Sequence, residues 1–149
     1  MRTEADREAL RNAVADGTIT AICSDHQPQD RDAKLDPFPL TEPGISGLDT
    51  LAPLVLGLVD TGVLDLVRAI EALTSGPGRI AGTGAGTLAV GAPADVCVID
   101  PSARWRLQAK DLASRGHNTP FIGTELAGRV RLTLVAGRVV HESGRGCER

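Results

Sequence analysis

The sequence predicts an α/β protein that changes to antiparallel β structure in its C-terminal part. Two observations predict this fold class. A helical pattern, a tight turn, an apolar β-prone run and a polar loop follow one another within the first 30 residues, which is typical of parallel α/β units. Short β segments with alternating side chains then follow from Gly86. We therefore expect α/β structure at residues 1–85 and β strands at residues 86–149.

The first helix is predicted from residue 3. Thr3 and Asp6 have the spacing of a capping box, and Leu10 and Val14 have the spacing of one buried stripe. The Asp16-Gly17 pair ends this helix. The β-prone run at residues 18–24 (TITAICS) then predicts a buried strand that ends in a polar loop.

A long irregular loop, residues 27–47, separates this strand from two predicted helices. Loops of this length inside a compact domain are uncommon and are often functional. The two helices are expected at residues 48–59 and at residues 65–74, the second capped by Asp65. The Gly-Pro-Gly triplet at residues 76–78 is expected to end the helical region.

Three β segments are predicted after residue 85. The first two lie at residues 86–91 and 94–101, and the third, at residues 129–141, contains a hairpin turn at Ala136-Gly137. The 85-residue α/β part holds one convincing parallel strand, which cannot close a sheet by itself. We therefore expect the chain to be the end of a larger protein.

The composition is that of a globular protein: 42% of the 149 residues are hydrophobic, 23% are charged, and the formal net charge is −3. The longest apolar run, residues 51–59, contains Pro53 and Gly57 and is too short to span a membrane. The charged N-terminus lacks the apolar segment of a secretory signal. No membrane partner is therefore expected.

The numbers of cysteines and aromatic residues exclude further classes of function. Three widely spaced cysteines favour a reducing cytoplasm over a disulfide or thiolate-metal scaffold: Cys23, Cys97 and Cys147. Two phenylalanines and one tryptophan are too few to form a stacking platform for single-stranded nucleic acid. Residues 101–149 are basic, but their arginines are scattered and alternate with apolar residues, which is typical of solvated strand faces. No nucleic-acid partner is expected.

Asp25 is the strongest candidate for a chemical role. It lies where the predicted strand meets the polar loop, which is where α/β barrels carry active-site residues. A carboxylate there can ligate a metal and transfer protons, and the alternative that Asp25 only caps a turn beside Pro28 is equally open. Ser24, Asp25 and His26 are contiguous, so they cannot form a Ser–His–Asp relay.

Two other motifs carry less weight. Gly82, Gly84 and Gly86 imitate a dinucleotide fingerprint, but a β segment follows them, so we interpret them as a turn. The only histidines are His26, His117 and His141, which have no metal-ligand spacing, whereas a catalytic zinc needs about three protein ligands.

Several strings resemble those of dihydroorotases in the amidohydrolase superfamily. Residues 24–29 (SDHQPQ) resemble the (T/S)DHxPH signature, and residues 43–49 (PGISGLD) resemble the glycine-rich substrate loop. Residues 2–10 resemble the segment before the last barrel strand. Residues 86–101 (GTLAVGAPADVCVIDP) are similar to the segment that opens the small β domain, and residues 118–123 (NTPFIG) complete the resemblance.

The resemblance implies the C-terminal part of a (β/α)₈ TIM barrel, followed by strands of a small composite β-sandwich. It also implies zinc, a cytoplasmic and oligomeric protein of pyrimidine biosynthesis, and the reversible conversion of dihydroorotate to N-carbamoyl-aspartate by a metal-bound hydroxide. Asp25 would be the catalytic metal ligand and proton shuttle, and Gln29, Pro43 and Gly44 would bind substrate.

Departures from the family pattern keep a second function open. The other metal ligands of the family would lie upstream of Met1, Gln29 replaces a substrate-binding histidine, and Pro43 replaces a phenylalanine. Residues 25–28 (DHQP) and 42–47 (EPGISG) are more similar to a bacterial dihydroorotase-like branch, whose members have lost metal ligands and serve as non-catalytic partners of aspartate carbamoyltransferase. The sequence also does not separate a dihydroorotase from a hydantoinase-like relative. For the 149 residues alone, we expect no catalysis.

Overall fold

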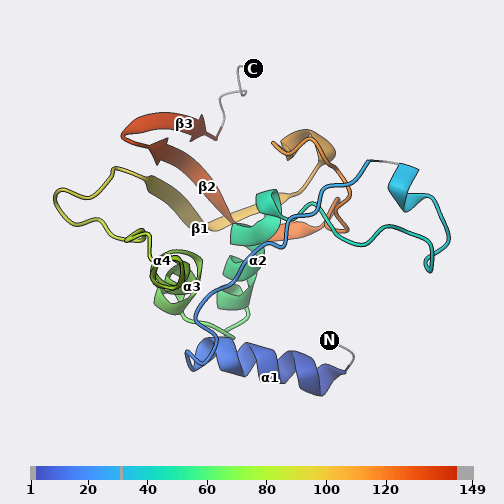
Figure 1. The fold of residues 1–149 in the computed structure, drawn as a ribbon, viewed down its shortest axis with the longest axis horizontal. Helices are drawn as coiled ribbons and strands as arrows, with labels where there is room; N and C mark the ends of the chain where they lie inside the picture. Colours follow the sequence, from blue (N-terminus) through green and yellow to red (C-terminus); the bar gives the residue numbers. More distant parts are fainter. Residues whose placement is uncertain (1–2, 31, 144–149) are drawn as a thin grey trace.

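The computed structural model describes residues 3–30 and 32–143 (Figure 1). Helices fill the first part of the chain and strands the second, in the order α1 (Glu4–Ala15), η1 (Asp32–Lys34), α2 (Leu48–Asp60), α3 (Leu66–Leu73), α4 (Ser75–Ala81), β1 (Val96–Arg106), η2 (Ala109–Asp111), β2 (Glu125–Val135) and β3 (Arg138–Glu142). Helices η1 and η2 are short 3₁₀ turns. Cys147 lies outside the described residues. None of the described helices is both long and apolar enough to cross a membrane.

Helix α1 begins with the predicted capping box. The Asp6 amide donates to the Thr3 hydroxyl at 3.1 Å, and the Thr3 amide donates to the Asp6 carboxylate at 3.0 Å. Val14 is buried as predicted, but Leu10 is 45% exposed, so the expected stripe is only partly covered by the described residues. The helix ends at Ala15 with Asp16 as its C-cap, and Gly17 then adopts a φ of +87°, which glycine tolerates without strain.

The strand predicted at residues 18–24 is wrong. This segment has bends at residues 18–19 and no regular structure at residues 20–24, it pairs with no strand among the described residues, and its backbone instead bonds to helices. The Ile19 amide donates to the Ala13 carbonyl at 2.8 Å, and the Ile22 amide donates to the Ala72 carbonyl at 3.0 Å. The apolar side chains Ile19 and Ile22, on which the strand prediction depended, pack against the helical core. Burial against helices and burial in a sheet leave the same short apolar pattern, so the sequence does not distinguish the two.

Helices α2 and α3 confirm the predicted helices, and the Asp65 carboxylate caps α3 by accepting the Arg68 amide at 2.7 Å. The predicted stop at residues 76–78 is wrong, because α4 runs through it. Pro77 lies in the first turn of α4, where a missing amide is tolerated. Gly76 and Gly78 serve close packing instead: a Cβ on Gly78 would lie 2.6 Å from the Ala85 carbonyl oxygen.

The helical core is a buried apolar cluster between the helices. Its buried members come from α1, α2, α3 and the turn before α3: Val14, Val55, Leu64 and Ala69. Arg68 of α3 adds hydrogen bonds to α1 and to the segment after it, since its guanidinium donates to the backbone carbonyls of Val14 and Ile19. Helices distant in sequence are thereby held together.

The strands form one antiparallel sheet in the order β1-β2-β3. The segments predicted at residues 94–101 and 129–141 are confirmed as parts of this sheet, and Ala136 and Gly137 form the hairpin turn with φ values of +49° and +77°. The strand predicted at residues 86–91 is wrong, because this stretch is a loop in which Gly86 and Gly91 have positive φ values. Helix α2 packs on β2, where Gly128 leaves room for the buried Leu56.

Candidate functional site

Asp25 lies at the end of the segment that follows α1. Its side chain is exposed, and its backbone has a φ of +44°, in the left-handed region that non-glycine residues rarely adopt. Backbone strain of this kind persists where the surroundings impose it, and it occurs often at functional sites. The Gln27 side-chain amide donates to the Asp25 carboxylate at 3.3 Å.

The two strings that carried the strongest resemblance lie side by side. His26 forms a parallel bridge with Ile45, and the Gln27 amide donates to the Ile45 carbonyl at 2.8 Å. Two glycines permit this approach. Gly44 has a φ of +98°, and a Cβ there would clash with Gln27, while a Cβ on Gly47 would lie 2.7 Å from the Ser24 carbonyl oxygen.

His26 performs a structural task in this arrangement. Its Nδ1 accepts hydrogen bonds from the amides of Gly47 and Leu48, at 3.1 and 3.2 Å. These amides lie at the start of α2, whose N-cap Gly47 has no side chain to satisfy them. His26 is therefore the cap of α2, a role that its position beside Asp25 did not reveal in the sequence.

The structure brings Gln29, Pro43 and Gly44 together. The Gln29 side-chain amide donates to the Pro43 carbonyl at 3.3 Å, and the Lys34 ammonium donates to the carbonyl of Gly44 at 2.9 Å. Of the predicted site residues, Asp25 lies at the start of the same polar loop, where it is linked to Gln27. Sequence reasoning missed Lys34, which has no recognisable motif around it.

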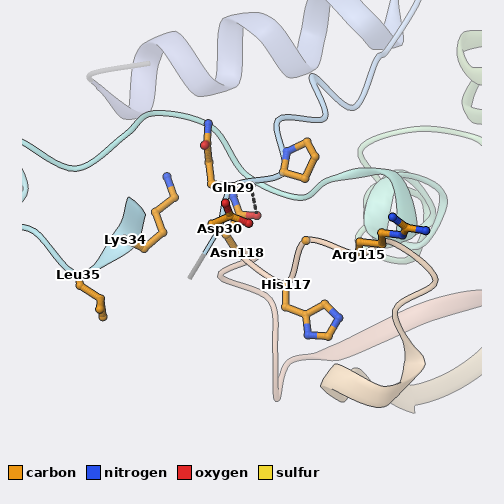
Figure 2. A pocket seen from close by; sticks show the side chains of 9 residues that line it. Gln29, Asp30, Lys34, Leu35, Arg115, His117 and Asn118 are labelled. Atoms are coloured by element: carbon orange, nitrogen blue, oxygen red, sulfur yellow. Dashed lines mark hydrogen bonds between the residues drawn. The ribbon is translucent and has the colours of Figure 1, made fainter. Parts of the chain in front are cut away.

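A pocket of about 780 Å³ adjoins these loops (Figure 2). Gln29, Asp30 and Lys34 line it from the N-terminal half, and Arg115, His117 and Asn118 line it from the connection between β1 and β2. Asp25, Pro43 and Gly44 are not among its lining residues, so the pocket lies beside the predicted catalytic group rather than around it. In the sequence, Asn118 stood out only as a member of the segment 118–123. In the structure, its side chain accepts a hydrogen bond from the Gln29 amide and donates one to the Gly44 carbonyl, so it joins the β1–β2 connection to the N-terminal half of the chain.

The described residues do not by themselves fit a catalytic zinc ion. Within residues 3–30 and 32–143, no three His, Cys, Asp or Glu side chains are grouped closely enough to hold a metal. Asp25 can supply one carboxylate, and His26 uses its Nδ1 to cap α2. His117 lines the pocket, and His141 lies exposed on the edge strand β3.

Comparisons with known proteins place this geometry in a family. Residues 1–140 match the amidohydrolase family. The chain is 49% identical over 142 residues to a dihydroorotase-like protein of Pseudomonas aeruginosa, and 48% identical over 145 residues to a dihydroorotase of Anaeromyxobacter dehalogenans. These matches cover 95% and 97% of the chain. The chain spans about a third of the length of these curated relatives.

Solved structures agree with the predicted fold class. An L-hydantoinase (dihydropyrimidinase) from Arthrobacter aurescens superposes with a TM-score of 0.86 at 29% identity, over 96% of this chain and 33% of that one. A D-hydantoinase superposes with a TM-score of 0.84 at 23% identity, over 95% and 32%, which supports the fold alone. The prediction of an α/β chain matching part of a TIM-barrel amidohydrolase is confirmed. Because the family match covers nearly the whole chain and the solved structures superpose along it, the chain belongs to the amidohydrolase family.

Proposed function

We propose that the full polypeptide carrying this sequence is a dihydroorotase, which interconverts dihydroorotate and N-carbamoyl-aspartate in pyrimidine biosynthesis. One observation carries the proposal: the parallel bridge between His26 and Ile45 aligns the loop of Asp25 and Gln29 with the loop of Pro43 and Gly44. The names of several relatives in the same family support the same substrate. We assign the activity to the cytoplasm on the basis of the cysteine pattern.

In this proposal Asp25 is the acid–base group. An exposed carboxylate on a constrained backbone can accept a proton when water attacks the cyclic amide and can return it to the leaving nitrogen. Gln29 and the backbone groups of Pro43 and Gly44 would contact the substrate, and the hydrogen bond between Gln29 and Pro43 would set their mutual position.

The proposed reaction uses zinc, but the described residues supply only part of a zinc site. Asp25 would supply one ligand, and the remaining ligands would have to come from residues other than those described here. For this reason we expect the 149-residue chain by itself to give no turnover above an Asp25→Ala control.

A second candidate function is that of a non-catalytic, dihydroorotase-like subunit that holds aspartate carbamoyltransferase in an oligomer. One observation favours it: Gln29 stands where the family has a substrate-binding histidine, and its side-chain amide is occupied by the Pro43 carbonyl. A group that is satisfied inside the protein gains less from binding a ligand.

The test is to compare turnover of dihydroorotate by the full polypeptide and by its Asp25→Asn and Asp36→Asn variants. Asp36 lies exposed in the long loop and is the matched control. We expect Asp25→Asn to lower kcat by about 10²–10⁴-fold, the usual effect of removing a general acid–base group, and Asp36→Asn to leave kcat unchanged. No turnover by the unmodified polypeptide, together with co-purification of aspartate carbamoyltransferase, would support the scaffold function instead.

A further inference from the structure

The connection between β1 and β2 reaches across the molecule to the loops of the candidate site. We call its residues 113–118 the clamp segment, because they contact both the loop after α1 and the loop before α2 (Figure 1). More than 60 residues separate the clamp segment from either loop, so the sequence offers no local signal of these contacts.

The Asn118 side chain makes the central contacts of the clamp segment. Its Oδ1 accepts the Gln29 amide at 2.9 Å, and its Nδ2 donates to the carbonyls of Gln27 at 3.1 Å and Gly44 at 3.3 Å. A single amide side chain therefore satisfies backbone groups on both loops at once. An amide is suited to this because it offers a donor and an acceptor side by side.

Two further side chains attach the clamp segment to the loop before α2 and to the first turn of α2. The Ser46 hydroxyl donates to the Gly116 carbonyl at 2.7 Å, and the Ser46 amide donates to the Asn118 carbonyl at 3.2 Å. The Asp49 carboxylate accepts the Ala113 amide at 2.8 Å and also the Ser114 hydroxyl. Ser46 is only 2% exposed, so its own hydrogen bonds compete less with water than the exposed bond between Asp49 and Ala113.

The clamp segment also packs tightly on the loop after α1. A Cβ on Gly116 would lie 2.5 Å from the Pro28 Cβ, so the backbone at Gly116 touches the proline ring. This close approach fixes the distance between Asn118 and residues 27–29, and no larger residue fits at position 116 without moving one of the two segments.

We propose that Asn118 is a positioning residue that sets the geometry of the substrate loops, so that the connection between β1 and β2 controls how tightly substrate binds. This inference rests on the proposed function, because it takes Gln29, Pro43 and Gly44 as the groups that contact substrate. Asn118 would act on them through the backbone of Gln29 and Gly44, to which its side chain is hydrogen-bonded. Its loss should therefore weaken binding more than it slows the chemical step.

The variant Asn118→Asp separates the two halves of the amide. It retains an acceptor for the Gln29 amide, but it loses both donors and places a carboxylate oxygen against the carbonyls of Gln27 and Gly44. Asn12→Asp is the matched control, since Asn12 is the only other asparagine and its side chain is exposed on α1.

The first measurement is hydrogen exchange by mass spectrometry on the full polypeptide. In Asn118→Asp we expect peptides covering residues 26–30 and 43–48 to exchange about fivefold faster or more, since the bonds that close the two loops are weakened. The peptide covering α3 should be unchanged, as should all peptides of Asn12→Asp. Unchanged exchange in both loops of Asn118→Asp would overturn the proposal, because the loops would then be held without this side chain.

The second measurement is the kinetics of dihydroorotate turnover. We expect Asn118→Asp to raise KM by about tenfold and to change kcat by less than about threefold. Faster exchange with an unchanged KM would overturn the positioning role and leave a purely structural one. If the unmodified polypeptide neither turns over dihydroorotate nor binds N-carbamoyl-aspartate by calorimetry, the proposed function fails, and the positioning role fails with it. The hydrogen-exchange result is independent of this outcome and still decides whether Asn118 holds the two loops.

Discussion

The helical core and the loop cluster of this protein are built by different forces. We use loop cluster for residues 24–29, 43–48 and the clamp segment. In the helical core, buried apolar side chains such as Val55 and Ala69 pack between helices. In the loop cluster, the segments are joined by hydrogen bonds between backbone and polar side chains, and Asp25 adopts a left-handed backbone conformation.

This difference separates the part of the chain that supplies stability from the part in which polar contacts fix the geometry. Apolar burial is non-directional and supplies most of the free energy of folding. Hydrogen bonds contribute less net free energy but fix distances and directions, which is what a binding or catalytic site requires. We therefore expect changes in the helical core to lower the free energy of unfolding of the whole unit, and changes in the loop cluster to act mainly on local opening.

The largest effect on stability is expected for Leu64→Ala in the helical core. Leu64 is 5% exposed, and its truncation removes apolar contacts and leaves a cavity. The free energy of unfolding, measured by urea denaturation, should fall by about 2–5 kcal/mol. The control Leu40→Ala, at a leucine that is 71% exposed, should change it by less than about 0.5 kcal/mol. Equal effects at the two positions would contradict the assignment of the core.

Arg68→Met tests whether polar contacts also stabilise the helical core. The Arg68 side chain is 11% exposed, and its loss leaves the carbonyls of Val14 and Ile19 without their donor. We expect the free energy of unfolding to fall by about 1–3 kcal/mol. Arg79→Met is the matched control, because Arg79 pairs with the same Glu71 but is 60% exposed, and an exposed pair contributes less than about 1 kcal/mol. Similar values for both variants would show that only the shared ion pair matters.

His26→Ala tests the hydrogen bonds at the junction of the two regions. It removes the acceptor for the amides of Gly47 and Leu48 at the start of α2. We expect the free energy of unfolding to fall by about 0.5–2 kcal/mol, as for other N-cap deletions, and hydrogen exchange at residues 47–48 to become faster. His141→Ala on the exposed edge strand should do neither, and unchanged exchange in His26→Ala would refute the capping role.

The smallest effect on stability is expected at Asp100, on the sheet and outside both regions. The Arg131 guanidinium and the Ser102 hydroxyl beside it lower the pKa of the Asp100 carboxyl from 3.8 to about 2. Because this pKa is lower in the folded state, the resulting stabilisation is present above pH 3.8 and is lost as the pH falls toward 2. Carboxyl-carbon NMR titration should show the pKa of Asp100 rising toward 3.8 in Arg131→Ala and staying low in Arg138→Ala.

The local features of the fold could be predicted because their partners lie within a few residues. The capping box of Thr3 and Asp6, the Asp65 cap of α3 and the Ala136-Gly137 turn each depend on short-range backbone geometry. The grouping of Gln29 with Pro43 and Gly44 came from motif resemblance, and the structure places these residues together. The catalytic role of Asp25 stays a prediction.

Only the tertiary structure decided the remaining features. Residues 18–24 have a strand-like pattern, yet whether an apolar run forms a strand depends on a neighbouring strand, and the described residues offer helices instead. Gly76 and Gly78 look like a helix stop, yet their purpose is close packing against distant backbone. Asn118 joins loops about 90 and 74 residues away, because long-range hydrogen bonds depend on the folded path of the chain and leave no periodic trace in the sequence.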